Sequence, residues 1–479
     1  FLETETDAVT VITNISNSKV IPERESLIID KVIGYLDKNL GDYPFEKLVI
    51  SNIDYKENPV YGLNQLPDFF SPFPEDFKYE LKILKTAINN YVDRTLFINL
   101  RKDKWVADAV KMNIMMRYMD DFYPKLKVLG TLNRYWIARQ FNISKLEFND
   151  QYNLLYMHMA RLNLDQSLDT PKDSLIKFNV NIANAYKAAS GVNYLSEYLS
   201  DTLINNSIRE FYNENQLKLT NPGNLELKIK SKTTGNLDWF FNDFVKTRKN
   251  IDFKFNEVHK NGDSLTIQLR NKTGILVPIP VYGMQGDSIV SKTWVEGFKK
   301  EKEISISAEN IDRVAINAEG FVPEYNRRNN YKKINPFLGI NKPFQFKLFQ
   351  DIEDPSKNQV FFMPVAEYNF YDGLKLGAKM YNKTLLSKNF SYKIEPQYGF
   401  KSDKVTGSAG FTYTQNLEEG NLFAIRYGMS GALSSYAPDA LYKRYSPFIT
   451  FAFRPDDFRS DKRQYLTVRN INVYRDESN

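Results

Sequence analysis

Zinc ligands are scarce in this sequence. It has 479 residues, no cysteine and two histidines, His158 and His259, which lie far apart in the chain. Catalytic zinc is ordinarily held by three protein side chains, among which histidine predominates. The chain therefore cannot assemble an ordinary histidine-ligated zinc site from its own residues. The absence of cysteine also excludes disulfides, thiolate catalysis and Cys-ligated metals.

Other residues with chemical potential have structural interpretations beside the functional ones. His158 stands among apolar residues at helical spacing and is predicted to be a packed or half-exposed helix residue. His259 precedes the turn Lys260–Gly262 and is predicted to face solvent. Arg327 and Arg328 could together bind a carboxylate or phosphate. A structural ion pair is the favoured interpretation of that arginine pair.

Composition limits the classes of partner. The net charge of +6 is mild for 479 residues, and no dense Lys/Arg run is interleaved with aromatic residues. Nucleic acid is therefore not an expected partner. No run of about 18 apolar residues is present, so no transmembrane helix is predicted. The chain opens on Phe1 inside a predicted strand and lacks an initiator Met, and we expect it to be part of a longer polypeptide.

The hydrophobic pattern predicts an α+β, multidomain chain. Residues 1–22 are predicted to end an upstream β domain, and residues 23–218 to form a helical domain, because apolar residues recur there at helical spacing. The predicted helices include Tyr79–Val92, Trp105–Phe122, Gly130–Phe141, Asn149–Leu162, Leu175–Ala188, Tyr194–Leu199 and Ile204–Gln216.

Two β regions are predicted to follow. Residues 219–340 contain short strands separated by turns, the first at Leu225–Ser231, and are predicted to form a β-sandwich. Residues 341–479 show longer strands in which apolar and polar positions alternate, as in Tyr392–Tyr398. An antiparallel sheet with one aromatic face and one polar face is expected there. The alternation is equally compatible with part of an outer-membrane barrel and with a soluble β fold.

Local motifs resemble those of a known peptidase family. They are the loop Asn58–Pro67, the helix around Lys104–Asp108, the stretch Phe178–Leu199, and the later phrases Asp351–Pro355 and Ser434–Pro438. Together with the helical domain and sandwich, they resemble the M1 (gluzincin) zinc aminopeptidases. The resemblance is closer to Bacteroidetes members that carry a C-terminal β-rich or outer-membrane-barrel segment. It implies an M1-like fold over nearly the whole chain.

The resemblance also implies a site, and the site is degenerate. The family's zinc helix, H-E-x-x-H, aligns with Tyr79–Ile83, which leaves Glu80 as a vestigial general base and no histidine ligand. Asp108 stands at the third-ligand position and Tyr186 at that of the transition-state tyrosine. The substrate-cleft motif becomes Gly62, Asn64 and Gln65, where Asn64 replaces the glutamate that pairs with a substrate amine.

Simpler interpretations compete with these roles. Glu80 is also explained as a surface charge paired with Lys82 or Lys85, since glutamate is mostly exposed. Asp108 is also explained as a helix cap or an ion-pair partner.

The motif losses favour a pseudopeptidase that uses no metal or other cofactor. We expect a binding or scaffolding subunit in the cell envelope of a Gram-negative bacterium, in the outer membrane or periplasm. Its expected partners are other envelope proteins and a peptide segment, with membrane association through the C-terminal β segment. One alternative is an active metallopeptidase, with zinc or another metal on Glu80, Asp108 and other oxygen ligands, or with a catalytic site supplied elsewhere. Another is a soluble structural subunit.

Overall fold

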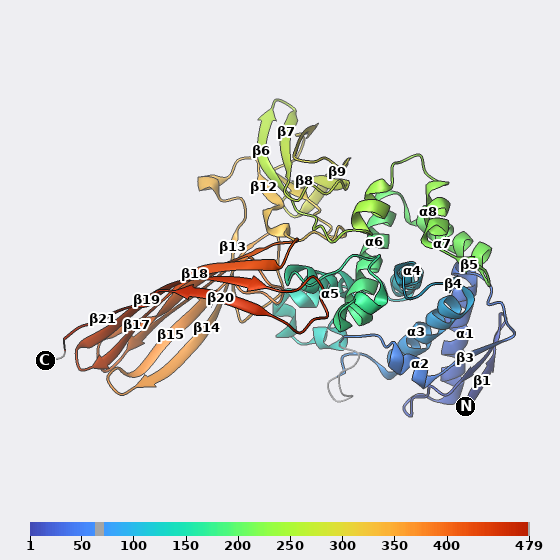
Figure 1. Ribbon diagram of the computed structural model, residues 1–479, viewed down its shortest axis with the longest axis horizontal. Helices are drawn as coiled ribbons and strands as arrows, with labels where there is room; N and C mark the ends of the chain where they lie inside the picture. Colours follow the sequence, from blue (N-terminus) through green and yellow to red (C-terminus); the bar gives the residue numbers. More distant parts are fainter. Residues whose placement is uncertain (63–70, 478–479) are drawn as a thin grey trace.

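The computed structural model describes residues 1–62 and 71–477. Its three parts are a helical body, a small β-sandwich beside it, and a long β-sheet that extends from the body as an arm (Figure 1). The architecture is α+β and multidomain, as predicted from the sequence. Among the described residues, no helix is both long enough and apolar enough to cross a membrane.

A three-stranded sheet joins the N-terminus to the helical body. Strands β1 (Leu2–Glu5), β2 (Thr10–Thr13) and β3 (Lys47–Ile50) lie in that order, with β2 parallel to β3. Helix α1 (Pro22–Asn39) connects β2 to β3, and its apolar face is buried in the same hydrophobic core as the sheet. The predicted boundary after residue 22 therefore falls inside this sheet.

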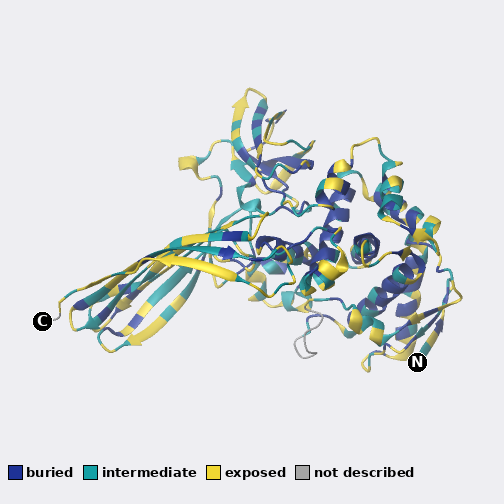
Figure 2. Cartoon of the chain, viewed as in Figure 1, coloured by how far each residue is buried: buried dark blue, intermediate teal, exposed yellow. Residues whose placement is uncertain are grey.

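Seven further helices occur in the described part of the body. Helices α3 and α4 are largely buried along their length (Figure 2). They lie side by side in the body and form the framework of the site described below. The seven are α2 (Asn52–Glu57), α3 (Glu75–Thr95), α4 (Lys104–Phe122), α5 (Asp150–Arg161), α6 (Asn184–Tyr198), α7 (Asp201–Asn215) and α8 (Pro222–Lys230); a short parallel pair, β4 (Phe97–Ile98) and β5 (Leu219–Thr220), joins the ends of α3 and α7.

Three local predictions need correction. The helix predicted at Gly130–Phe141 is a series of short 3-10 turns, because this segment is exposed and buries no apolar stripe. The strand predicted at Leu225–Ser231 is helix α8. Asn221 caps that helix, and Leu225 and Ile229 are buried one turn apart on it. The helices predicted on either side of residue 190 are one element, a π-helical turn (Asn179–Ala183) that continues into α6.

Two sheets pack face to face in the β-sandwich, as predicted. They bury Ile267 and Leu269 of one sheet with Val281 and Val314 of the other. A short π-helix, Trp239–Phe244, precedes them. The first sheet has the order β10 (Glu301–Ser307), β7 (Ser264–Asn271), β6 (Phe253–Asn261), and the second β12 (Tyr331–Lys333), β11 (Arg313–Ile316), β8 (Ile279–Gln285), β9 (Ser288–Val295).

Nine strands form the arm. They follow one another in sequence order from β13 to β20, with β21 paired to β19, and every pair is antiparallel except β13 with β14. The strands are β13 (Phe344–Leu348), β14 (Asn358–Asn369), β15 (Gly373–Tyr381), β16 (Phe390–Gly399), β17 (Lys404–Asn416), β18 (Leu422–Ala437), β19 (Ala440–Phe453), β20 (Gln464–Arg469) and β21 (Asn472–Arg475).

Register in the arm confirms the predicted alternation. Tyr398 lies opposite Leu376 on one side and Val405 on the other, so aromatic and aliphatic residues of successive strands share a face. Glu395 and Ser408, which are paired, lie on the opposite face. Much of the apolar face is exposed (Figure 2). We call it the apolar face of the arm; it includes Tyr368, Leu374, Leu376, Ile394, Tyr398, Val405, Ala409, Phe411, Tyr427, Met429, Tyr445, Ile449, Leu466 and Val468.

Candidate functional site

A cavity of about 340 Å³ lies between α3, α4 and the start of α6. Its walls combine apolar side chains with an unusual number of charged and phenolic ones. The charged lining residues are Glu57, Lys85, Asp93, Lys104, Asp108, Lys111 and Lys172, and the tyrosines are Tyr61, Tyr152 and Tyr186. The volume is at the lower end of the range for small-molecule sites, which suits a group of one or two amino-acid residues.

One wall of the cavity is an ion-pair network on α3 and α4. The buried Asp108 carboxylate contacts the Nζ atoms of Lys104 and Lys111, the latter at 3.6 Å. Lys111 Nζ also donates to both carboxylate oxygens of Asp93, at 2.9 and 3.0 Å. Burial acts to raise the pKa of Asp108, but the Lys104 and Lys111 charges outweigh it and hold that pKa below its ordinary value. Asp108 is thus an ion-pair partner.

Lys85 reaches the same cavity without an ion pair. The side chain is half-buried on α3, and its ammonium group has no hydrogen-bond or salt-bridge partner among the described residues. Burial, followed by the nearby charge of Lys111, lowers the pKa of Lys85 to about 8. At neutral pH this amine is still mostly protonated, so the cavity contains an uncompensated positive charge.

Two of the three lining tyrosines pack against each other. Tyr186 on α6 and Tyr152 on α5 are buried, and their rings meet edge to face with centroids 4.8 Å apart. The Tyr152 hydroxyl is buried without a hydrogen-bond partner in the part of the chain that the structure describes. No hydrogen bond of the Tyr186 hydroxyl occurs there either. Burial raises the pKa of both phenols, so each remains an O–H donor at any physiological pH. Tyr186, predicted to stand at the site, does line it.

Glu80 does not line this cavity, and its interpretation as a surface charge paired with Lys82 or Lys85 is wrong. The residue is 5% exposed, so it is not a surface charge, and it pairs with neither Lys82 nor Lys85. Its carboxylate accepts from Lys31 Nζ at 2.7 Å, from Tyr123 Oη at 2.7 Å and from the Tyr118 hydroxyl. Glu80 therefore ties α3 to α1 and α4, on a different face of α3 from the cavity.

The predicted alignment of Glu80 with Asp108 across a metal site also needs correction. Lys85, rather than Glu80, is the α3 residue beside Asp108. One turn further along α3 stands the buried Asn89. A metal at Asp108 would have to displace two ammonium groups and would face a third. No group of three or more His, Cys, Asp or Glu residues suited to a metal occurs within the described ranges. The residues present do not fit zinc.

The loop predicted to carry the substrate-cleft motif is described only in part. Val60 and Tyr61 line the cavity, and Gly62 follows them with a φ of +127°, a conformation open to glycine. Asn64 and Gln65 lie outside the described residues. The two histidines lie away from the site. His158 is half-buried near Phe178, and the exposed His259 contacts Glu257 at 3.0 Å.

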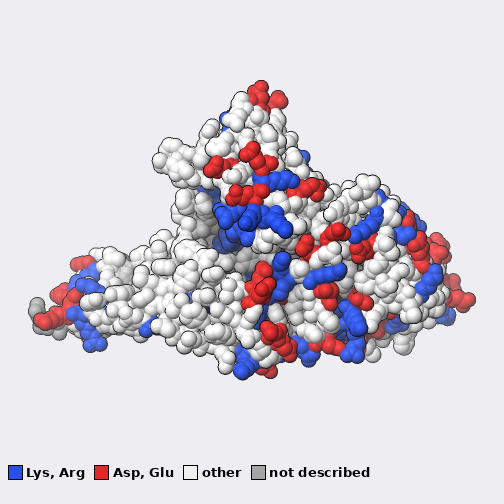
Figure 3. Space-filling model, turned by 45° about the horizontal axis from the view of Figure 1, so that its top comes forward, with Lys and Arg blue, Asp and Glu red and all other residues white. Residues whose placement is uncertain are grey.

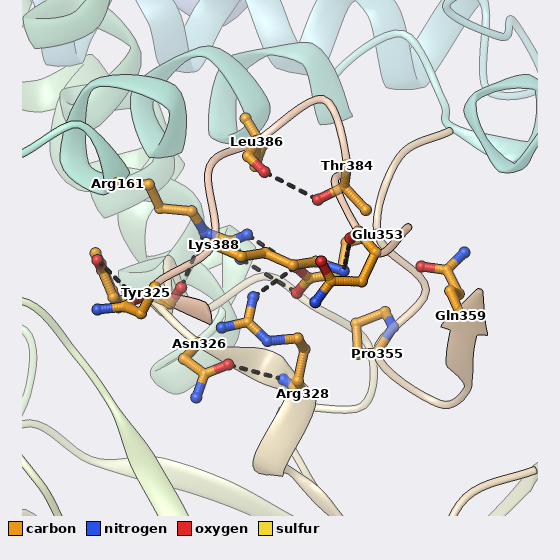
Figure 4. A network of polar contacts seen from close by, with 12 residues as sticks. Arg161, Tyr325, Asn326, Arg328, Glu353, Pro355, Gln359, Thr384, Leu386 and Lys388 are labelled. Carbon is orange, nitrogen blue, oxygen red and sulfur yellow. Dashed lines mark hydrogen bonds and ion pairs between the residues drawn. The ribbon is translucent and has the colours of Figure 1, made fainter. Parts of the chain in front are cut away.

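A second buried ionic network joins the three parts of the molecule (Figure 4). Arg161 of α5 binds the Glu353 carboxylate through two nitrogens, at 2.9 and 3.2 Å, and Arg328 binds it at 2.8 Å. Burial acts to raise the pKa of Glu353, but the two arginines outweigh it and hold that pKa far below its usual range. The favoured interpretation of the Arg327–Arg328 pair, a structural ion pair, is confirmed for Arg328.

The sequence did not lead us to predict a functional role for the lysines of the cavity, although their spacing contains a signal. Lys104, Asp108 and Lys111 follow the i, i+4, i+7 spacing that puts one acid between two bases on one helix face. Lys85 interrupts the apolar run of a helix that is otherwise buried. A charged residue at such a position needs a partner or a ligand, and the pattern alone does not say which.

Comparison with known proteins gives no family assignment. No family model matches the sequence, and no curated protein matches it. Among solved structures, the chain is similar to Legionella pneumophila aminopeptidase A in complex with aspartic acid, at 10% sequence identity and a TM-score of 0.45. The similarity covers 66% of this chain and 36% of that one. The chain thus spans about a third of the length of that structure.

Proposed function

We propose that this chain is a non-catalytic, M1-peptidase-like protein of the cell envelope whose cavity between α3 and α4 binds a peptide segment. The observation that carries the proposal is the ion-pair network at Asp108. The predicted third metal ligand is neutralised by Lys104 and Lys111. A group held in this way stabilises the helix pair and is not available as a metal ligand.

Peptide binding suits the remaining lining of the cavity. Val60, Leu100, Met112 and Met115 provide an apolar surface for a side chain. Lys85, Tyr152 and Tyr186 provide hydrogen-bond donors without partners, which suit the carbonyl and carboxylate oxygens of a peptide. A cavity of this kind can bind and orient a ligand without any group that activates water.

The arm supports a place at a membrane. Its apolar face carries aromatic and aliphatic residues on successive strands, with polar and charged residues on the opposite face. Charged side chains gather at the tip of the arm and on the body, and few occur between them in the view of Figure 3. We propose that this face contacts the lipid of an outer membrane, and that the helical body then lies in the periplasm or at the membrane surface.

The binding proposal is tested by measuring whether peptides stay bound to the protein and whether they remain uncleaved. The protein, equilibrated with zinc, is incubated with a mixed peptide pool, and the peptides that co-elute with it are identified by mass spectrometry. We expect full-length peptides to be retained, and Ala185→Phe, which fills the cavity, to abolish retention. Ala138→Phe, the same change in a 3-10 turn outside the cavity, should leave retention intact. Steady loss of terminal residues from the pool would overturn the proposal in favour of a peptidase.

A pair of neighbouring substitutions tests the membrane proposal. Ala409 lies on the apolar face of the arm and Ser408 on the opposite face of the same strand. Ala409→Lys should weaken flotation of the protein with lipid vesicles, since a lysine on a lipid-facing strand costs about 2–4 kcal/mol at mid-membrane. Ser408→Lys should float as the unsubstituted protein does. Equal flotation of both variants, or none by the unsubstituted protein, would contradict lipid contact by this face.

A further inference from the structure

The cavity offers hydrogen-bond donors in excess of acceptors. Of its carboxylates, Asp93 and Asp108 are engaged by Lys104 and Lys111, and the third, Glu57, is exposed. The groups without partners deep in the described lining include the Lys85 ammonium, with three N–H donors, and the hydroxyls of Tyr152 and Tyr186. The exposed side chains of Glu57 and Lys172, of opposite charge, also line the cavity. A ligand that satisfies them must present several acceptors close together.

We propose that the cavity recognises a carboxylate, that of a peptide C-terminus, with Lys85 as its counter-charge and the Tyr186 hydroxyl as a second donor. This inference rests on the proposed peptide-binding function and names the end of the peptide that enters. A carboxylate has two oxygens that accept several hydrogen bonds, and it cancels the charge that Lys85 leaves uncompensated. The apolar wall at Met112 and Met115 then receives the terminal side chain.

The geometry explains why the amine end of a peptide is not the favoured ligand. An α-ammonium group would be placed beside Lys85 and near Lys104 and Lys111, and like charges in a partly buried site repel strongly. The carboxylates beside Lys85, those of Asp93 and Asp108, are already paired with lysines. Glu57, the remaining acid of the lining, is exposed to solvent. The cavity therefore has the polarity opposite to that of a site for free N-termini.

The pH dependence of binding follows from the same groups. Lys85 faces Asp93 on its own helix and Lys104, Asp108 and Lys111 on α4. The other titratable groups of the lining are Glu57, Tyr61, Tyr152, Lys172 and Tyr186. The Asp108 and Lys111 charges are held by their mutual ion pairs, so Lys85 is the group that titrates first as pH rises. Affinity for a carboxylate should be constant from about pH 5, above the pKa of the terminal carboxyl, to neutral pH, and fall as Lys85 loses its proton near pH 8.

The test uses matched probes that differ only at the terminal group. Binding of acetyl-alanyl-leucine, of its C-terminal amide and of acetyl-leucine is measured by calorimetry with the full chain and with Lys85→Gln and Lys82→Gln. The acid should bind at least about tenfold tighter than the amide, as for a charge-assisted hydrogen bond. Lys85→Gln should abolish this preference and Lys82→Gln, on the same helix but outside the cavity, should retain it.

Each alternative result is decisive. Equal binding of acid and amide, or a preference that survives in a Lys85→Gln variant with an unchanged circular dichroism spectrum, would overturn carboxylate recognition. Acetyl-leucine binding as tightly as the dipeptide would show a small-acid site and overturn the peptide terminus as ligand. If the pool peptides are retained but neither probe binds, this inference fails and the proposed function stands. If no peptide is retained at all, the proposed function fails as well.

Discussion

Two buried ionic networks in this molecule differ in completeness. At the junction of the three parts, the Glu353 carboxylate is fully occupied by Arg161 and Arg328. In the cavity, Asp108 and Asp93 are occupied in the same way, but Lys85 beside them is not. A completed network fixes elements relative to one another, whereas an incomplete one leaves a charge for a ligand to satisfy. This difference separates the structural site from the candidate binding site.

The largest effect is expected at the junction. Glu353→Gln would leave Arg161 and Arg328 without their counter-charge and should lower the free energy of unfolding by about 3–5 kcal/mol. Chemical denaturation followed by circular dichroism measures it. Peptide retention should survive at temperatures where the variant is folded. A change below about 1 kcal/mol would mean that the network does not hold the three parts together.

Low pH should also remove the stabilising contribution of Glu353. The pKa of Glu353 is lower in the folded than in the unfolded protein, so its stabilising contribution is complete above the unfolded value of about 4.3. The contribution is lost as pH falls below that value toward the folded pKa. The difference in stability between the unsubstituted protein and Glu353→Gln should therefore shrink steadily below about pH 4.

Glu80 tests the same distinction within the helical body. It accepts three hydrogen bonds and does not line the cavity. Glu80→Gln should lower the free energy of unfolding by about 1–3 kcal/mol and leave probe binding unchanged. Glu226→Gln on α8, whose partner Lys230 also contacts Asp238, should have little effect on either quantity. Loss of probe binding in a folded Glu80→Gln variant would place Glu80 in the functional site after all.

The smallest effect is expected at Lys85. Its folded pKa is lowered, so protonated Lys85 disfavours the folded state, and this penalty disappears as pH rises above the unfolded value of about 10.4. Lys85→Met should therefore match or exceed the unsubstituted protein in stability below about pH 8, by up to about 1 kcal/mol. Thermal unfolding across pH 7–10 measures this. A clear loss of stability at pH 7 would show that Lys85 has a structural partner.

Hydrophobic periodicity predicted the helices and strands of the fold, but it did not predict which side chains meet in the cavity. The alternation in Tyr392–Tyr398 and the helical spacing in Trp105–Phe122 are periodic patterns of apolar residues, because one face of each element packs against apolar neighbours. Asp108 and Tyr186, which the family resemblance singled out, do line the cavity. The position of Lys85 in the cavity was not predicted, because which residues of α3 face α4 depends on the relative rotation of the two helices. The same rotation sends Glu80 to the opposite side of α3, toward Lys31.

Helix α8 shows the limit of local pattern. The run from Leu225 alternates apolar and charged residues, which favours a strand. The cap at Asn221, Pro222 in the first turn and packing against α7 outweigh that alternation. A short alternating run is thus a weak predictor when helix start signals precede it.

Zinc stoichiometry tests the central claim most directly. The purified, tag-free protein is dialysed to equilibrium against a zinc-containing buffer, and bound zinc is measured by elemental mass spectrometry alongside Asp108→Ala. Since Lys104 and Lys111 occupy Asp108 and Lys85 stands beside it, we predict zinc far below one per chain in both proteins. About one zinc per chain, lost in Asp108→Ala, would contradict the account and make this cavity a metal site.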